Sequence, residues 1–164
     1  MKVMFLSLFR SGTLPKMPGT WGSLVSAIIF SFFWGVLPND FILKFVVLGT
    51  VLIIVYSFAV RFIKEVVDDH DYDKQWIVID EFIGMMIACL PFFFFQNFSW
   101  LLLISGFALF RLFDIWKPLG IKKIDGWNTP NSVMLDDLVA GFYALIIQLV
   151  VLQIFFPILL FSLH

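Results

Sequence analysis

Long apolar runs separated by short polar segments dominate this sequence. A membrane-spanning helix needs about 20 predominantly apolar residues, and runs near this length occupy residues 20–37, 41–63, 77–95, 98–116 and 135–161. The first run is the weakest, because it is short and opens among glycines, so it could re-enter the membrane instead of crossing it. The pattern predicts an all-α fold: a polytopic membrane bundle of about five helices, the first either spanning or re-entrant.

The links between the runs differ in length on the two sides of the membrane. Links 38–40 and 96–97 are minimal turns, whereas links 64–76 and 117–134 are long and polar. Five alternating spans place both long links on the same side as the amino terminus. Since the sequence has no internal repeat or low-complexity linker, we expect residues 1–164 to form a single integral-membrane domain.

Charged residues are concentrated in the segments that this threading brings to one side. Only Lys44 among the basic residues and Asp40 among the acidic ones lie near the opposite ends of the runs. Basic residues collect on the cytoplasmic side of membrane proteins. We therefore expect the amino terminus and the long polar links in the cytoplasm, and the carboxyl terminus outside.

Composition supports a membrane protein and excludes several other classes. Hydrophobic residues make up 61% of the chain, against roughly 45–50% in soluble domains, and the mean hydropathy is +0.98. A net charge of −1 offers no basic patch, so nucleic acid is not an expected partner. The single cysteine, Cys89, has no intrachain disulfide partner, and His70 and His164 are too far apart in sequence to suggest a zinc site.

An excess of acidic groups lies within about one or two turns of the predicted cytoplasmic ends of the runs. The charged residues at this depth are Asp80, Glu81, Arg111, Asp114, Asp136 and Asp137. Carboxylates at helix starts can be explained by the helix dipole alone, but a charge at the bilayer centre costs roughly 2.5–3.5 kcal/mol. Five acids against one arginine cannot neutralise one another. A bound divalent cation is the expected solution, and all-oxygen ligands suit Mg²⁺ or Mn²⁺.

Two segments near this layer could bind a phosphate. Arg111 and Asp114 share a helix face, and Lys117 follows at the helix end, although an ordinary ion pair with a basic helix terminus fits this pattern too. Segment 12–23 is a loop rich in glycine and proline that runs into a helix, whose free N–H groups favour anions. Lys16 adds a positive charge to that loop.

Small residues follow two of the carboxylates by one helical turn. Gly84 lies four residues after Asp80, and Gly141 lies four residues after Asp137. Closely packed membrane helices favour small residues where they touch. We therefore expect the helices that carry the carboxylates to pack closely around the polar layer.

A metal, phosphate-binding cations and a membrane interface together indicate phosphoryl chemistry on a lipid. Other phosphatase mechanisms lack their residues here: no arginine lies six residues after Cys89, no aspartyl-phosphate motif follows a strand, and no pair of suitable histidines exists. Water activated by a metal remains, because a bound metal lowers the pKa of water and neutralises charge on the phosphoryl oxygens.

Four blocks, in order, match a known family. They are residues 18–23 (PGTWGS), 77–84 (IVIDEFIG), 110–118 (FRLFDIWKP) and 136–141 (DDLVAG). In these blocks the chain resembles phosphatidylglycerophosphatase A, a bacterial membrane enzyme that converts phosphatidylglycerophosphate to phosphatidylglycerol. The resemblance implies Mg²⁺ dependence and a role in phospholipid biosynthesis. Departures from the family pattern at Lys74, Gly120 and residues 128–132 concern loops and leave headgroup preference open.

The residues expected to act fall into three overlapping sets. The expected metal ligands are Asp80, Glu81, Asp136 and Asp137. The expected catalytic residues are Asp80, Glu81, Asp114 and Asp137, with Asp114 as a ligand or general base. The expected substrate-binding residues are Lys16, Thr20, Ser23, Arg111 and Lys117. Neither the number of metals nor the oligomeric state follows from the sequence.

The resulting hypothesis is a phosphatase of the bacterial cytoplasmic (inner) membrane, with its active site on the cytoplasmic face and phosphatidylglycerophosphate as substrate. Two alternatives stay open. A CDP-alcohol phosphotransferase also gathers aspartates at cytoplasmic helix ends, but its long aspartate motif is absent. A small channel or transporter with an acidic mouth would distribute charge through the membrane, whereas here the far half of every run is uncharged apart from Lys44 near one end.

Overall fold

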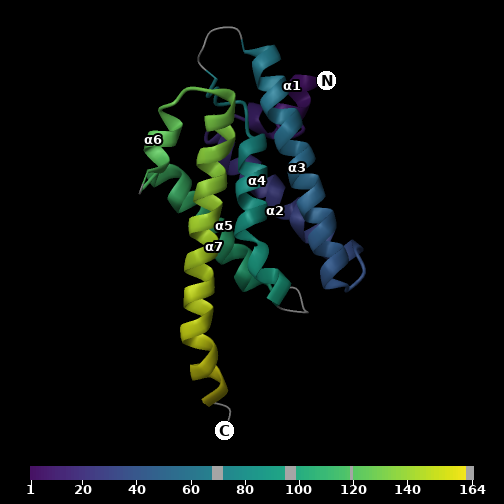
Figure 1. The fold of residues 1–164 in the computed structure, drawn as a ribbon, viewed down its shortest axis with the longest axis vertical. Helices are drawn as coiled ribbons and strands as arrows, with labels where there is room; N and C mark the ends of the chain where they lie inside the picture. Colours follow the sequence, from purple (N-terminus) through teal and green to yellow (C-terminus); the bar gives the residue numbers. More distant parts are fainter. Residues whose placement is uncertain (68–71, 95–98, 119, 162–164) are drawn as a thin grey trace.

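The computed structural model describes residues 1–67, 72–94, 99–118 and 120–161, and all regular structure in these ranges is helical (Figure 1). The α-helices are α1 (Lys2–Leu6), α2 (Pro18–Val36), α3 (Phe41–Val66), α4 (Ile79–Ala88), α5 (Trp100–Trp116), α6 (Ile121–Asp125) and α7 (Pro130–Phe161). Two short 3₁₀ helices complete the described elements: η1 (Ser11–Thr13) and η2 (Leu90–Phe94). The prediction of an all-α fold is confirmed. The turn predicted at 96–97 and the acidic stretch around His70 lie outside the described residues.

Three helices of the described chain are long and apolar enough to cross a membrane: Pro18–Val36, Phe41–Val66 and the Pro130–Ile154 part of α7. The first apolar run thus forms one continuous helix of 19 residues. The third and fourth runs form shorter helices, since α4 has 10 residues and α5 has 17. The prediction of about five membrane helices therefore corresponds to three long helices and two shorter ones.

Helix ends follow local sequence signals. The side chain of Asp40 accepts a hydrogen bond from the N–H of Leu43 (2.9 Å) and so caps the start of α3. Ser99 caps α5 in the same way through the N–H of Leu102. At the other end of α5, Lys117 adopts a left-handed conformation (φ 46°). The helix cannot continue beyond this point because a proline follows.

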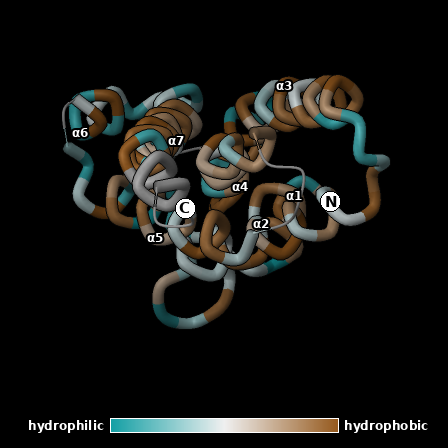
Figure 2. The backbone as a smooth tube through the Cα atoms, turned by 90° about the horizontal axis from the view of Figure 1, so that it is seen from below, coloured by the Kyte–Doolittle hydropathy of each residue, from teal (hydrophilic) through white to brown (hydrophobic). Residues whose placement is uncertain are grey.

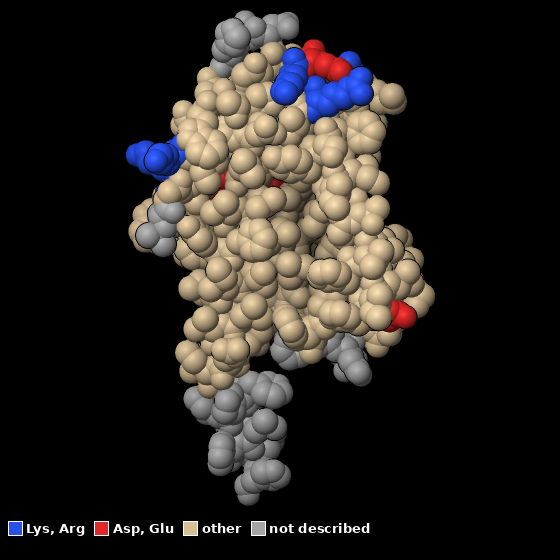
Figure 3. All heavy atoms as spheres, viewed as in Figure 1, with Lys and Arg blue, Asp and Glu red and all other residues tan. Residues whose placement is uncertain are grey.

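Short helix α4 lies in the middle of the bundle. Figure 2 shows α2, α3, α5 and α7 around it, and each of these four helices contacts it. All ten residues of α4 are buried, which agrees with a helix that is apolar on every side beyond its first turn. Most charged side chains on the face in Figure 3 gather on its upper part, and the broad surface below them is uncharged apart from one acidic side chain at the lower right. This distribution suits a membrane protein with one polar end.

The start of α4 is held by the amino-terminal segment. The N–H of Val78 donates to the carbonyl of Leu6 at the end of α1 (2.9 Å). Gly12 in η1 lies so close to the carbonyl of Trp76 that a Cβ would collide with it. The residues before the membrane helices therefore position the first turn of α4, which carries two carboxylates.

Helices α4 and α7 meet at a pair of glycines. A Cβ on Gly141 would collide with the carbonyl oxygen of Gly84, and a Cβ on Gly84 would lie 2.6 Å from the carbonyl oxygen of Asp137. The ring of Phe110 covers Gly84 from α5. The close packing expected around these small residues is confirmed, and it brings the two carboxylate-bearing helices together.

A buried glutamine donates a hydrogen bond to the last backbone carbonyl of α4 inside the bundle. The Nε2 of Gln148 on α7 donates to the carbonyl of Ala88 (2.7 Å), while its Oε1 accepts from the hydroxyl of Ser105 on α5 (3.1 Å). The last carbonyls of a helix have no partner within the helix, and lipid offers none. Gln148 thus lets α4 end within the apolar region and links three helices.

Replacing Gln148 with leucine should lower the stability of the folded protein by about 1–2 kcal/mol, because the Ala88 carbonyl would lose its partner. Unfolding in mixed micelles, followed by circular dichroism, measures the change. Gln153→Leu is the matched control, since Gln153 lies on the same helix and is exposed. Equal stability of the two variants would contradict the role assigned to Gln148.

Candidate active site

Three carboxylates from two helices converge at the polar end of the bundle. Asp80 and Glu81 occupy the first turn of α4, and Asp137 projects from α7. All three residues are buried, at 4–8% exposure. Each can offer one oxygen, and these oxygens lie within 4.8 Å of one another. This arrangement could hold a divalent cation, as expected for three of the four predicted ligands.

Asp136, the fourth predicted ligand, lies beside this cluster and has a different partner. It accepts a hydrogen bond from the Nζ of Lys117 (2.8 Å), which also bonds Asp125 of α6 (2.6 Å). Burial by itself would lower the pKa of Lys117, but these two carboxylates outweigh it and leave that pKa raised. Lys117 therefore stays protonated and joins α6 to α7. Its predicted role in phosphate binding and the metal-ligand role of Asp136 stay predictions.

Arg111 connects α5 to the carboxylate cluster. Its Nη1 lies 2.6 Å from Asp114 and 4.0 Å from Glu81. The same nitrogen donates to the hydroxyl of Ser23 on α2 (3.4 Å), and that hydroxyl donates to the carbonyl of Gly19 (2.8 Å). The guanidinium is thus held by two acids and one hydroxyl from three helices.

The start of α2 closes against the same group of charges. A Cβ on Gly19 would collide with Oε1 of Glu81 and lie 3.0 Å from Nη1 of Arg111, so glycine permits the contact. The N–H groups of Thr20 and Trp21 donate to the carbonyl of Met17 (3.0 and 3.3 Å). Those two backbone donors, which were expected to face an anion, are therefore already engaged.

Three buried polar atoms at this site have no hydrogen-bond partner within the described chain: Thr20 Oγ1, Glu81 Oε2 and Arg111 Nε. An unsatisfied buried polar group costs about 1–3 kcal/mol, and in native structures it commonly indicates an ion or ligand. The free oxygen of Glu81 suits a cation. The free N–H of Arg111 suits an anion beside it. The residues present thus fit a divalent metal next to a phosphate group.

A cavity of about 450 Å³ opens onto these groups. Its walls come from the start of α2, the segment before α4, the first turn of α4, and the charged ends of α5 and α7. The residues lining it are Met17, Pro18, Gly19, Asp73, Gln75, Ile77, Asp80, Glu81, Arg111, Asp114, Ile115, Lys117, Asp136 and Asp137. Acidic groups, Arg111 and Lys117 therefore share one recess of the polar end.

The remaining predicted residues surround this cavity less directly. Ser23 is buried behind Arg111, and Thr20 is half-buried on α2. Lys16 is exposed and lines a neighbouring cavity of about 560 Å³, which shares Gln75 with the acidic one. Residues near the site that the sequence did not indicate include Asp73, Gln75 and Asp125. All three lie in long polar links, where no periodicity indicates which side chains turn toward the site.

Comparison with known proteins shows which family this chain belongs to. The family model for phosphatidylglycerophosphatase A matches residues 4–152. The chain belongs to the phosphatidylglycerophosphatase A family. Members of this family are phosphatases of a lipid phosphate monoester, so the prediction of an enzyme of this class is confirmed.

Two relatives carry the family name. The Haemophilus influenzae "Phosphatidylglycerophosphatase A" is 34% identical over 149 residues, which cover 85% of this chain and 81% of that protein. The Escherichia coli "Phosphatidylglycerophosphatase A" is 35% identical over 137 residues, covering 81% and 73%. A Bacteroides thetaiotaomicron protein named "Putative phosphatidylinositol-3-phosphatase" is 34% identical over 140 residues, covering 85% and 86%. No solved structure matches the chain significantly.

Proposed function

We propose that the protein hydrolyses phosphatidylglycerophosphate to phosphatidylglycerol and phosphate with the help of Mg²⁺. The observation that carries this proposal is the buried cluster of Asp80, Glu81 and Asp137 beside Arg111 in one cavity. Oxygen-only ligands suit Mg²⁺. The names of the Haemophilus influenzae and Escherichia coli relatives agree with this substrate.

The residues around the reacting phosphate have different roles. Arg111 holds the phosphoryl oxygens, and its pairs with Asp114 and Glu81 fix the direction of the guanidinium. Lys117 and Asp136 keep the cavity wall in place through α6. When bound to the three carboxylates, Mg²⁺ would acidify a water molecule and offset the charge on the phosphate.

The reaction forms one bond to phosphorus and breaks one. A water oxygen attacks the phosphorus of the monoester while the bond from phosphorus to the glycerol oxygen breaks. A cavity carboxylate takes the proton of the water, and the departing glycerol oxygen takes up a proton to become a hydroxyl. Asp114 is the proposed base, because it lies at the cavity wall and is oriented by Arg111.

The proposed location is the bacterial inner membrane, with this cavity on the cytoplasmic face. Most basic residues lie in the segments at the polar end of the bundle, as the cytoplasmic preference of lysine and arginine requires. The uncharged surface below the site would lie in the bilayer, so the acyl chains of the substrate stay in lipid while its headgroup enters the cavity.

Phosphate release by the purified protein in detergent micelles tests the function. With Mg²⁺ we expect release from phosphatidylglycerophosphate, and EDTA should reduce the rate at least about 100-fold until Mg²⁺ is restored, because the bound metal supplies several kcal/mol of charge stabilisation. A parallel assay uses phosphatidylinositol 3-phosphate, the substrate class in the name of the Bacteroides relative. Hydrolysis that survives EDTA, or release only from phosphatidylinositol 3-phosphate, would contradict the proposal.

A further inference from the structure

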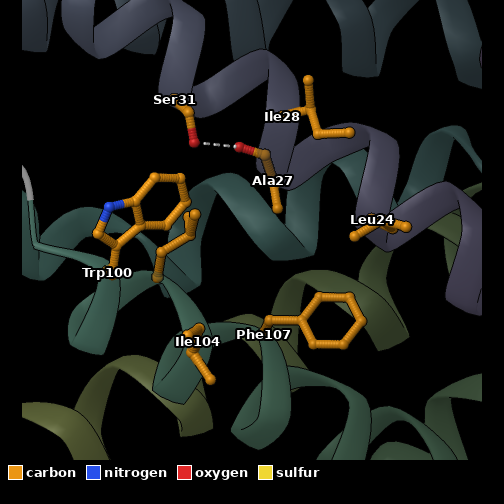
Figure 4. A pocket seen from close by; sticks show the side chains of 8 residues that line it. Leu24, Ala27, Ile28, Ser31, Trp100, Ile104 and Phe107 are labelled. Carbon is orange, nitrogen blue, oxygen red and sulfur yellow. Dashed lines mark hydrogen bonds between the residues drawn. The ribbon is translucent and has the colours of Figure 1, made fainter.

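An apolar groove of about 410 Å³ lies between α2 and α5 (Figure 4). Ala27 and Leu103 form its buried floor, at 5% and 7% exposure, while Ile28 and Ile104 stand exposed at its rims. Apart from the Ser31 hydroxyl and the indole N–H of Trp100, the side chains that line it are hydrocarbon, and the Ser31 hydroxyl donates to the carbonyl of Ala27 (2.8 Å). The groove therefore offers hydrocarbon contacts to whatever fills it.

The groove and the acidic cavity share two helices, α2 and α5. On α2, Gly19 lines the cavity and Leu24 lines the groove five residues later. On α5, which runs the opposite way, Arg111 lines the cavity and Phe107 lines the groove one turn earlier. Figure 4 shows the matching order, with Leu24 on the side of Phe107 and Ser31 on the side of Trp100. The groove thus begins next to the cavity and leads away from it.

The extent of the groove along α5 matches the thickness of one bilayer leaflet. At 1.5 Å per helical residue, Phe107 lies about 6 Å and Trp100 about 17 Å along α5 from Arg111. The hydrocarbon core is about 30 Å thick, so one leaflet is about 15 Å deep. If Arg111 binds a headgroup phosphate at the membrane surface, the groove spans the layer that the acyl chains of the same lipid occupy.

The geometry points to this groove as the binding site for one acyl chain of the lipid whose phosphate monoester enters the acidic cavity. This inference rests on the proposed function, because it takes that lipid as the substrate. The small side chain of Ala27, between the larger Leu24 and Ile28, makes the space for the chain. Seating the chain there positions the phosphate against Arg111, so the groove acts on substrate positioning and selects lipids with long chains.

Two substrates of different chain length separate this inference from the proposed function. The wild type and variants are assayed with Mg²⁺ in detergent micelles on dioleoyl and on dihexanoyl phosphatidylglycerophosphate. Ile28→Trp narrows the groove at its rim, and Ala27→Phe fills its floor. For both we expect kcat/KM on the dioleoyl lipid to fall about tenfold, as for a misfitting group in an apolar pocket. The value on the dihexanoyl lipid should stay within about twofold of the wild type.

The matched control is Ile53→Trp on α3. Ile53 is 69% exposed and Ile28 is 61% exposed, but Ile53 lines neither the groove nor the acidic cavity. This control variant should keep the wild-type kcat/KM on both lipids. A thermal melt of each variant in the same micelles checks that it folds.

The outcomes are distinct. A loss confined to the long-chain lipid in Ile28→Trp supports the groove, and the same loss in Ala27→Phe strengthens it. The inference about the groove is overturned if folded Ile28→Trp keeps the wild-type kcat/KM on both lipids. It is also overturned if kcat/KM falls by the same factor on both. A smaller particle mass for Ile28→Trp by light scattering, with rates unchanged, would instead assign the groove to a second copy of this chain. Wild-type protein that hydrolyses neither lipid would refute the proposed function itself.

Discussion

Asp137→Asn is expected to lower kcat about 1000-fold, which corresponds to about 4 kcal/mol of lost transition-state stabilisation. Asparagine keeps the shape of the side chain but removes one of the three charges that converge with Asp80 and Glu81. In metal-free protein the same change relieves repulsion among buried carboxylates. The melting temperature in EDTA should therefore be unchanged or higher, whereas a merely structural role for Asp137 would lower it.

A carboxylate at the opposite end of the molecule provides the control. Asp40 caps α3 by accepting a hydrogen bond from Leu43, and asparagine caps helices equally well. Asp40→Asn should therefore match the wild type in activity and stability. Wild-type turnover by folded Asp137→Asn would show that the cluster does not carry the chemistry.

Gly141→Ala is expected to reduce both stability and activity. The new methyl group would collide with the carbonyl oxygen of Gly84, so α4 and α7 must move apart. Overpacking of this kind costs about 1–3 kcal/mol. The shift would also separate Asp137 from the carboxylates of α4, and a displacement near 1 Å can cost about 100-fold in rate. Thermal melts and the phosphate-release assay measure the two effects.

Gly49→Ala is the matched control for this change. Gly49 lies within α3, and nothing lies within 4 Å of the position that its Cβ would take. Alanine is the better helix former, so this variant should gain up to about 1 kcal/mol without a change in activity. If Gly141→Ala behaved like Gly49→Ala, the contact between α4 and α7 would be looser than the structure indicates.

The helices and the family could be predicted from sequence because their signals are local. A bilayer demands long apolar stretches with internally bonded backbone, so hydropathy alone marks the long helices. The glycines that follow Asp80 and Asp137 by one turn also predicted the contact between α4 and α7, because closely packed membrane helices require small residues where they touch. Four ordered motifs were enough to indicate the family that comparison then showed.

The end of α4 could not be predicted in this way. Residues 77–95 form one apolar run, yet α4 stops at Ala88 and η2 follows. The partner that makes this end tolerable is Gln148, which is 60 residues away in sequence. Hydropathy measures the cost of exposing a residue to water, and it contains no information about which distant side chain satisfies a backbone carbonyl.

The charge pattern and the lengths of the apolar runs were enough to gather the acidic, basic and small residues at the polar end of a membrane bundle, because they leave few other arrangements. Which acids face one another depends on how the folded helices pack. Asp136 and Asp137 are neighbours, but successive residues of a helix point about 100° apart. Asp137 therefore joins Asp80 and Glu81, while Asp136 turns to Lys117. The rotation of α7 against α4 sets that choice, and it follows from packing across the whole bundle.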